Sequence, residues 1–204
     1  MRIAALVLAG GQARRLGGGD KPLIRLGDQT ILAHVLDRLA GQVDRIAISA
    51  NGDPARFARF GLPVLPDGPF AGQGPLAGLL AGLDWAAGQR AGGQGEAGPG
   101  ADALLSLPGD TPFIPRNLAA ALAPAPACAS SLGRAHHLLA LWPVAARTHL
   151  RGLLGEPGPR DVAHFARALR IRTVAFPATP WDPFLNINTP ADLALAERIA
   201  EQHG

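Results

Sequence analysis

"IAALVLAGGQARRLGGGDK", residues 3–21, joins a run of apolar side chains to a loop rich in glycine and basic residues. The six apolar residues at 3–8 predict a buried β-strand. The next residues, 9–21, contain five glycines. So many glycines weaken regular structure and let backbone N–H groups approach a ligand closely. The stretch therefore predicts a strand followed by a loop that holds phosphate groups.

Apolar runs recur along the first half of the chain, with helical patterns between them. The predicted strands cover residues 3–8, 45–51, 62–67 and 101–110, and the predicted helices cover 30–41, 74–85 and 114–123. Such alternation is typical of an α/β domain with a mainly parallel sheet. We therefore expect a three-layer, Rossmann-like fold with helices on both faces of one sheet.

The second half continues this alternation. Strands are expected at 138–142 and 171–176, and helices at 144–154, at 161–169 and after Thr189. Thr189 is a good N-cap residue, and Pro190 suits the first helical position. The glycine-rich residues 88–100 carry no large apolar side chain and predict a flexible surface loop, not a domain boundary. A single domain over residues 1–204 is the expected organisation.

The charge balance and the cysteine content exclude several classes of protein. Lysine and arginine total 19 against 16 aspartate and glutamate, and only 17% of the residues are charged. This excess is too small for a protein that follows a nucleic-acid backbone. The first apolar run is too short to cross a bilayer, and the single cysteine, Cys128, cannot form an intramolecular disulfide. We expect a cytoplasmic monomer with a buried thiol and no nucleic-acid or membrane partner.

The glycine-rich loop matches neither common phosphate-binding fingerprint. A dinucleotide-binding loop reads G-x-G-x-x-G, and a P-loop reads G-x-x-x-x-G-K-[ST]. Here Lys21 lies eleven residues beyond Gly10, and Arg15 stands between them. The loop therefore indicates phosphate binding of a different kind.

Two later segments add polar groups at the ends of predicted elements. Asp110 closes the predicted strand 101–110, and a carboxylate there suits Mg²⁺, which binds one or two carboxylates together with substrate phosphates. Asn186 and Asn188 precede the last predicted helix, and Thr189 can cap that helix without them. Their amides are therefore free for a ligand.

In chain order, LAGGQARRLGGGDKPL (8–23), SAN (49–51), GPLAG (74–78), PGDTPFIP (108–115) and NINTP (186–190) form a set. This set resembles the motifs of the molybdenum cofactor guanylyltransferases, the MobA family, over nearly the whole chain. The resemblance implies a nucleotide-diphospho-sugar-transferase-like fold. It also implies a reaction in which GMP from GTP is joined to molybdopterin-bound molybdenum cofactor with release of pyrophosphate.

The same resemblance implies roles for individual residues. Nucleotide binding is implied for Leu8, Ala9, Gly10, Lys21, Asn51, Asp67 and Asp110, with Lys21 on the phosphates and Asp110 as the Mg²⁺ ligand. Arg15, a third catalytic candidate, and Asn186 and Asn188 are implied to lie near the phosphates and the pterin. In such a transfer the attacking group is a phosphate anion, so no general base is needed, and positioning and charge neutralisation carry the catalysis.

The pterin side offers two further candidates. His136 stands where the family often has histidine, but the neighbouring His137 and Leu138 replace the proline and small residue that are common there. Arg160 follows the turn-forming segment GEPGP, and its charge suits an anionic molybdopterin phosphate. The other arginines between residues 147 and 172 are expected on a solvated surface.

Two rival functions are weighed against guanylyl transfer. A CTP-dependent molybdenum cofactor cytidylyltransferase of the same fold usually reads L-A-A-G where this chain reads L-A-G-G at 8–11. A non-catalytic carrier of the pterin cofactor would not need Lys21 and Asp110 together. The resemblance also implies transient contacts with proteins that donate the cofactor or mature molybdoenzymes.

Overall fold

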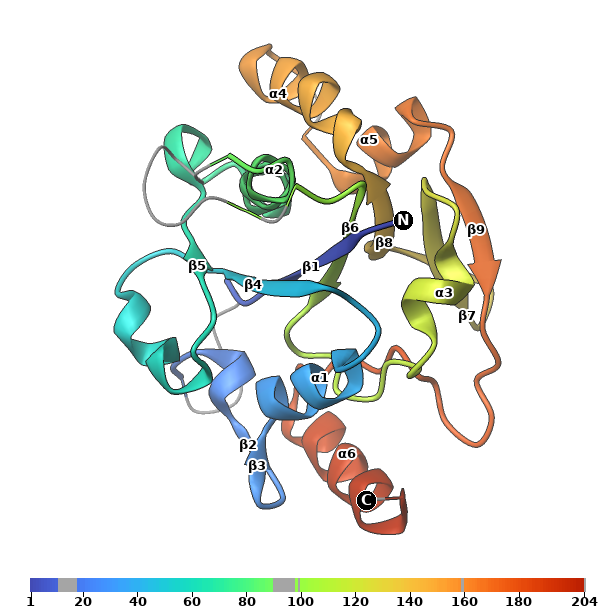
Figure 1. Cartoon of the computed structure of the whole chain (residues 1–204). Helices are drawn as coiled ribbons and strands as arrows, with labels where there is room; N and C mark the ends of the chain where they lie inside the picture. The colour runs from blue at the N-terminus through green and yellow to red at the C-terminus, as the bar shows by residue number, and fades with distance from the viewer. Residues whose placement is uncertain (11–17, 90–97, 99, 159, 204) are drawn as a thin grey trace.

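The computed structural model describes residues 1–10, 18–89, 98, 100–158 and 160–203 (Figure 1). Arg15, Gly11 and most of the segment 88–100 lie outside these residues, so their predicted roles are not addressed by the structure. Within the described residues no helix is long and apolar enough to cross a membrane.

One seven-stranded sheet forms the middle layer. Its strands, in spatial order, are β5 (Val64–Leu65), β4 (Arg45–Ser49), β1 (Ile3–Leu8), β6 (Ala103–Pro108), β8 (Arg134–Pro143), β7 (Ala127–Ser131) and β9 (Arg172–Ala175). The pairs β5–β4, β4–β1, β1–β6 and β7–β9 are parallel, whereas β6–β8 and β8–β7 are antiparallel. The predicted α/β fold with a mainly parallel sheet is thus confirmed.

Helices cover both faces of the sheet (Figure 1). One face carries α2 (Pro75–Ala86), α4 (Arg147–Gly155) and α5 (Val162–Ala168), and the other carries α1 (Ile31–Leu39) and α3 (Leu118–Leu122). Segments of 3-10 helix, η1 (Lys21–Leu23), η2 (Pro54–Phe60), η3 (Gly68–Phe70) and η5 (Val144–Ala146), lie in the connections. The apolar side chains of each layer therefore pack against the sheet from both sides.

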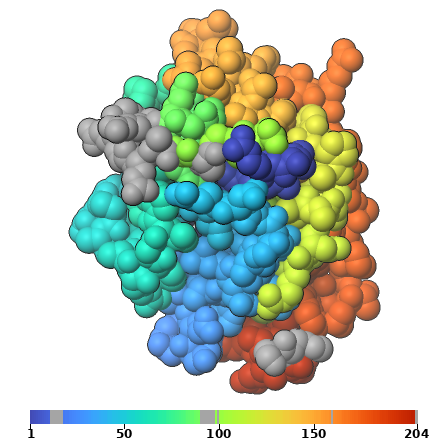
Figure 2. Space-filling view, viewed as in Figure 1, coloured from blue at the N-terminus to red at the C-terminus, as the bar shows by residue number. Residues whose placement is uncertain are grey.

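A smaller cluster lies outside the three layers. The last helix, α6 (Pro190–His203), packs beside the short hairpin of β2 (Arg25–Leu26) and β3 (Gln29–Thr30), as the space-filling view shows (Figure 2). Leu26, Ile187 and Ile199 are buried between them. This packing brings the segment before α6 next to Lys21 and Asp110.

Helix α2 lies unusually close to the sheet. A Cβ placed at Gly82 would lie 2.5 Å from a methyl carbon of Leu6, and one at Gly78 would lie 2.4 Å from Oγ of Ser49. Since only glycine lacks a Cβ, these two positions let the helix approach β1 and β4. The N-terminus of α2 is thereby held over the ends of those strands.

The structure differs from the predicted elements mainly in the second half. The strand β7 was not predicted, because its residues, ACASS, have low β-propensity and are ordered by pairing with β8 and β9 on either side. The strand β8 begins at Arg134 and not at residue 138, and its first half is only partly buried. The hairpin of β2 and β3 was also missed, because two-residue strands leave no detectable period.

The later arginines lie mostly on the exposed surface, as predicted, but several of them also contact neighbouring elements. Arg147 and Arg151 both pair with Asp84 of α2, at 3.8 Å and 2.5 Å. Arg172 donates hydrogen bonds to the carbonyl oxygens of Leu122 and Pro124. These side chains therefore join helices and strands to one another, a use of charge that sequence spacing does not indicate.

Candidate active site

The carboxyl ends of three parallel strands meet at one edge of the sheet. In the register, Leu8 of β1 lies between Ser49 of β4 and Pro108 of β6. The residues that follow each strand therefore emerge side by side, as expected at the ligand-binding edge of an open α/β sheet.

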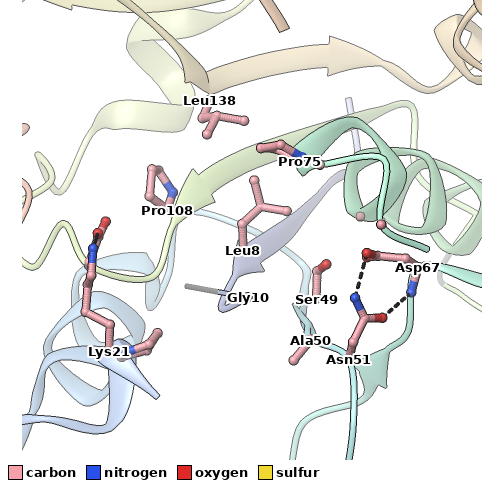
Figure 3. Close-up of a pocket in the computed structure, with 15 residues that line it drawn as sticks. Leu8, Gly10, Lys21, Ser49, Ala50, Asn51, Asp67, Pro75, Pro108 and Leu138 are labelled. Atoms are coloured by element: carbon pink, nitrogen blue, oxygen red, sulfur yellow. Dashed lines mark hydrogen bonds and ion pairs between the residues drawn. The ribbon is translucent and has the colours of Figure 1, made fainter. Parts of the chain in front are cut away.

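A cavity of about 480 Å³ opens at this edge (Figure 3). It is lined by Leu8, Gly10, Lys21, Pro22, Ser49, Ala50, Asn51, Asp67, Gly72, Gly74, Pro75, Gly78, Pro108, Asp110 and Leu138. Its volume lies within the usual range for small-molecule and cofactor sites. In the close-up, Lys21 lies on one side and Asn51 and Asp67 lie on the other, with Leu8 and Gly10 between them.

We call the side built from Lys21, Asp110, Asn186 and Asn188 the charged wall. The Lys21 ammonium nitrogen lies 2.9 Å from Oδ2 of Asp110 and donates to Oδ1 of Asn188 at 2.6 Å. The amide of Asn186 donates to the other oxygen of Asp110, Oδ1, at 2.8 Å. The side chains of Lys21 and Asp110 are only 14% and 15% exposed, so their charges act with reduced screening by water.

The start of α6 holds the two asparagines in place. The backbone N–H groups of Asn188 and Thr189 donate to Oδ2 of Asp192 at 3.0 Å and 2.8 Å, and the N–H of Asp192 donates to Oγ1 of Thr189 at 3.2 Å. Thr189 and Asp192 thus form the reciprocal cap that Thr189 predicted. Burial opposes ionisation of Asp192, but these hydrogen bonds and the nearby Lys21 charge hold its pKa below the ordinary value.

We call the opposite side, built from Asn51, Asp67 and the glycines at 72, 74 and 78, the amide wall. The amide of Asn51 donates to Oδ2 of Asp67 at 2.6 Å, and the N–H of Asp67 donates to Oδ1 of Asn51 at 3.0 Å. Gly72 and Gly74 have φ values of +84° and +73°, a region that favours glycine. The wall therefore offers amide and carboxylate groups beside nearly bare backbone.

The structure places the candidates from the sequence differently. Leu8, Gly10, Lys21, Asn51, Asp67 and Asp110 line the cavity, whereas Asn186 and Asn188 lie behind Asp110 and Lys21 and contact them. Ala9 is fully buried in the core, although its neighbours on both sides face the cavity. Arg15 lies outside the described residues.

His136 and Arg160 are not among the described residues that line the cavity. The ring of His136 packs against Phe184, with centroids 5.1 Å apart, and its Nε2 lies 2.8 Å from Oγ of Ser131. Burial lowers the pKa of His136. Arg160 donates to the carbonyl oxygen of Glu156, at 3.3 Å, between α4 and α5.

Several lining residues had not been assigned roles from the sequence. Ser49, Gly74 and Gly78 belong to the motifs SAN and GPLAG, so the motifs carried the signal although no role was attached to those positions. Gly72 and Leu138 reach the cavity through the fold alone. Cys128 is buried, as predicted, and burial raises the pKa of its thiol.

A lysine–carboxylate pair at the carboxyl ends of parallel strands, beside a cavity of about 480 Å³, suits an enzyme that binds the phosphates of a nucleotide. In agreement, the MobA-like NTP transferase domain family matches residues 5–171. A molybdenum cofactor guanylyltransferase of Acidiphilium cryptum is 55% identical over 195 residues, covering 96% of this chain and 94% of that protein. The chain belongs to the family of molybdenum cofactor guanylyltransferases, as the motif set predicted.

Two further relatives support this membership and the fold. A molybdenum cofactor guanylyltransferase of a Bradyrhizobium species is 46% identical over 205 residues, covering 97% of this chain and 93% of that protein. The crystal structure of molybdopterin-guanine dinucleotide biosynthesis protein A from Archaeoglobus fulgidus superimposes with a TM-score of 0.70, covering 99% of this chain and all of that one. At 22% identity the latter match concerns the fold.

Proposed function

We propose that this chain transfers GMP from GTP to molybdopterin-bound molybdenum cofactor, releases pyrophosphate, and uses a Mg²⁺ ion held by Asp110. Family membership supports the guanylyl transfer, and the charged wall supports the use of the ion. The observation that carries the proposal is the meeting of Lys21 and Asp110 opposite Asn51 and Asp67 in one cavity.

The donor set at Asp110 fits a magnesium ion that is completed by substrate. Within the described residues no group of three or more His, Cys, Asp or Glu side chains could enclose a metal. Mg²⁺ keeps several waters and is commonly held by one or two carboxylates together with substrate phosphates. When bound, the ion would neutralise charge on the phosphates at the reacting phosphorus.

The residues of the charged wall then have distinct tasks. Lys21 sits in the cavity with an ammonium group that can move from Asp110 to the phosphate oxygens once the nucleotide is bound. Asn186 holds one oxygen of Asp110 and leaves the other to Lys21, so the carboxylate keeps its orientation through that exchange. A second substrate that attacks through a phosphate anion needs no base from the protein.

The amide wall is proposed to bind the nucleoside. Asn51 and Asp67 present a donor and acceptors at the far side of the cavity from Lys21. The names of the relatives above favour guanine over cytosine, so the cytidylyl alternative is not favoured. The carrier alternative is less favoured, because it gives no reason for Lys21 and Asp110 to meet in the cavity.

The remaining assignments are part of the same proposal. We assign Asn186 and Asn188 to binding of the pterin substrate. We also assign His136 and Arg160 to it, although neither lines the cavity. Leu138, two residues along β8 from His136, lines the cavity, so that strand reaches the site. Action as a cytoplasmic monomer and transient contacts with cofactor-donating and molybdoenzyme-maturation proteins are proposed on the resemblance alone.

The substitution Asp110→Ala tests the metal and transfer roles together. We expect Mg²⁺-dependent pyrophosphate release from GTP and molybdopterin substrate to be lost, while circular dichroism shows a folded protein. Asp28→Asn, on the exposed turn between β2 and β3, is the control and should retain full turnover. Unchanged pyrophosphate release by Asp110→Ala would refute the mechanism. Greater thermal stabilisation by CTP than by GTP would refute the nucleotide assignment.

A further inference from the structure

Arg56, in η2, belongs to none of the motifs that identify the family, yet it contacts Asp20, which precedes Lys21 of the charged wall, and Asn51 of the amide wall. Its Nε forms an ion pair with Oδ2 of Asp20 at 2.8 Å. Its two terminal nitrogens donate to the carbonyl oxygens of Asn51, at 2.5 Å, and Asp53, at 2.8 Å. The two terminal nitrogens are therefore hydrogen-bonded to backbone carbonyls, whereas the buried Nε lies at ion-pair distance from Asp20 without a hydrogen bond.

The partners of Arg56 belong to the chain segments that form the two walls of the cavity. Asp20 directly precedes Lys21 of the charged wall, and Asn51 is itself part of the amide wall. A single side chain thus connects the segment that carries the lysine to the segment that carries the asparagine. Arginine suits this task because its fork of donors is rigid.

The local backbone is shaped around this side chain. Gly52 has a φ of +83°, and a Cβ there would lie 3.2 Å from a terminal nitrogen of Arg56. Phe57 is fully buried and anchors η2, and the Arg56 guanidinium carbon lies 4.9 Å from the centre of that ring. The guanidinium is therefore held in place by the Phe57 ring as well as by its polar partners.

The charge of Asp20 gives the contact a second consequence. A free carboxylate beside Lys21 would repel the triphosphate of an incoming nucleotide, and the Asp20 side chain is only 29% exposed. Pairing with Arg56 cancels that charge. Without the arginine, the carboxylate would also be free to compete with phosphate for the Lys21 ammonium.

We propose that Arg56 is a positioning residue for the nucleotide: it fixes the Asn51 backbone and neutralises Asp20, the residue next to Lys21. This inference rests on the proposed binding of GTP in the cavity. Arg56 itself touches no reacting atom, so its loss should weaken nucleotide binding more than it slows the transfer step.

The test compares four proteins with the wild type: Arg56→Gln, Asp20→Asn, the double variant and Arg59→Gln. Arg59 is a matched control, since it lies in the same 3-10 segment and stacks on Phe60 at 4.8 Å, but donates to Oγ1 of Thr30 and not to the cavity. The measurements are KM for GTP, kcat, and Kd for GTP by calorimetry with Mg²⁺ present.

We expect Arg56→Gln to raise KM and Kd for GTP about tenfold, with kcat changed by less than about threefold. Asp20→Asn should restore a substantial part of this loss in the double variant, because the repelling charge is gone, and Arg59→Gln should leave KM unchanged. Unaltered GTP affinity in Arg56→Gln, or no recovery in the double variant, would overturn the proposal. Failure of the wild type to bind GTP at all would instead overturn the proposed function.

Discussion

The two walls of the cavity are assembled over very different distances in sequence. In the charged wall, Lys21 and Asp110 are separated by 89 positions in the sequence, and Asp110 and Asn186 by 76. The amide wall joins Asn51 to Asp67, only 16 positions apart. The charged wall therefore depends on the packing of the whole domain, including α6, whereas the amide wall is built from the segments that follow β4 and β5 and from the start of α2.

If the two walls have separate roles, substitutions in the charged wall should lower kcat, and substitutions in the amide wall should raise KM for GTP. The following substitutions test that division, beginning with the largest expected effect.

Lys21→Met removes the ammonium and keeps a side chain of similar length. We expect kcat to fall by about 10²–10³-fold, the usual cost of removing one preorganised charge-stabilising group. Pyrophosphate release at saturating GTP measures this. Lys21→Arg, which keeps the charge but changes its shape, should lose less, and equal losses in the two variants would argue against a role for the charge.

Asn51→Ala breaks the pair with Asp67 on the amide wall. We expect KM for GTP to rise by about tenfold, the cost of one lost hydrogen bond to a partly buried acceptor, while kcat stays nearly unchanged. Steady-state kinetics with varied GTP would measure both quantities. A fall in kcat as large as that of Lys21→Met would contradict the division between the walls.

Gly78→Ala tests the packing beneath the amide wall. The new methyl group would lie 2.4 Å from Oγ of Ser49 and 3.3 Å from Oδ1 of Asp67, so we expect a loss of about 1–3 kcal/mol in unfolding free energy. Gly152→Ala in α4, which meets open space, should instead stabilise by about 0.5–1 kcal/mol. Urea denaturation measures both changes, and similar stability in the two variants would show that the contact at Gly78 relaxes without cost.

The fold could be predicted where burial leaves a clear pattern. The strands β1, β4 and β6 are nearly continuous apolar runs because helices cover them on both faces, and the predicted ranges contain them. Ala127–Ser131 has no such pattern. Its small residues become a strand only because β8 and β9 supply backbone partners on either side.

The same limit applies to the site. Glycine spacing and an isolated carboxylate pointed to Lys21 and Asp110, but the asparagine contacts that orient them depend on where α6 packs. Arg56 had no signal at all, because its role comes from the position of its guanidinium between Asp20 and Asn51.

By itself the sequence determined the kind of backbone where the local pattern is strong, as in the buried strands β1, β4 and β6 and the capped helix that follows Thr189. It did so because side-chain volume, polarity and backbone freedom act over a few neighbouring residues. Only the tertiary structure decided which polar groups meet, such as Lys21 with Asp110. Those meetings depend on how helices and strands far apart in the chain pack together, and no local pattern records that.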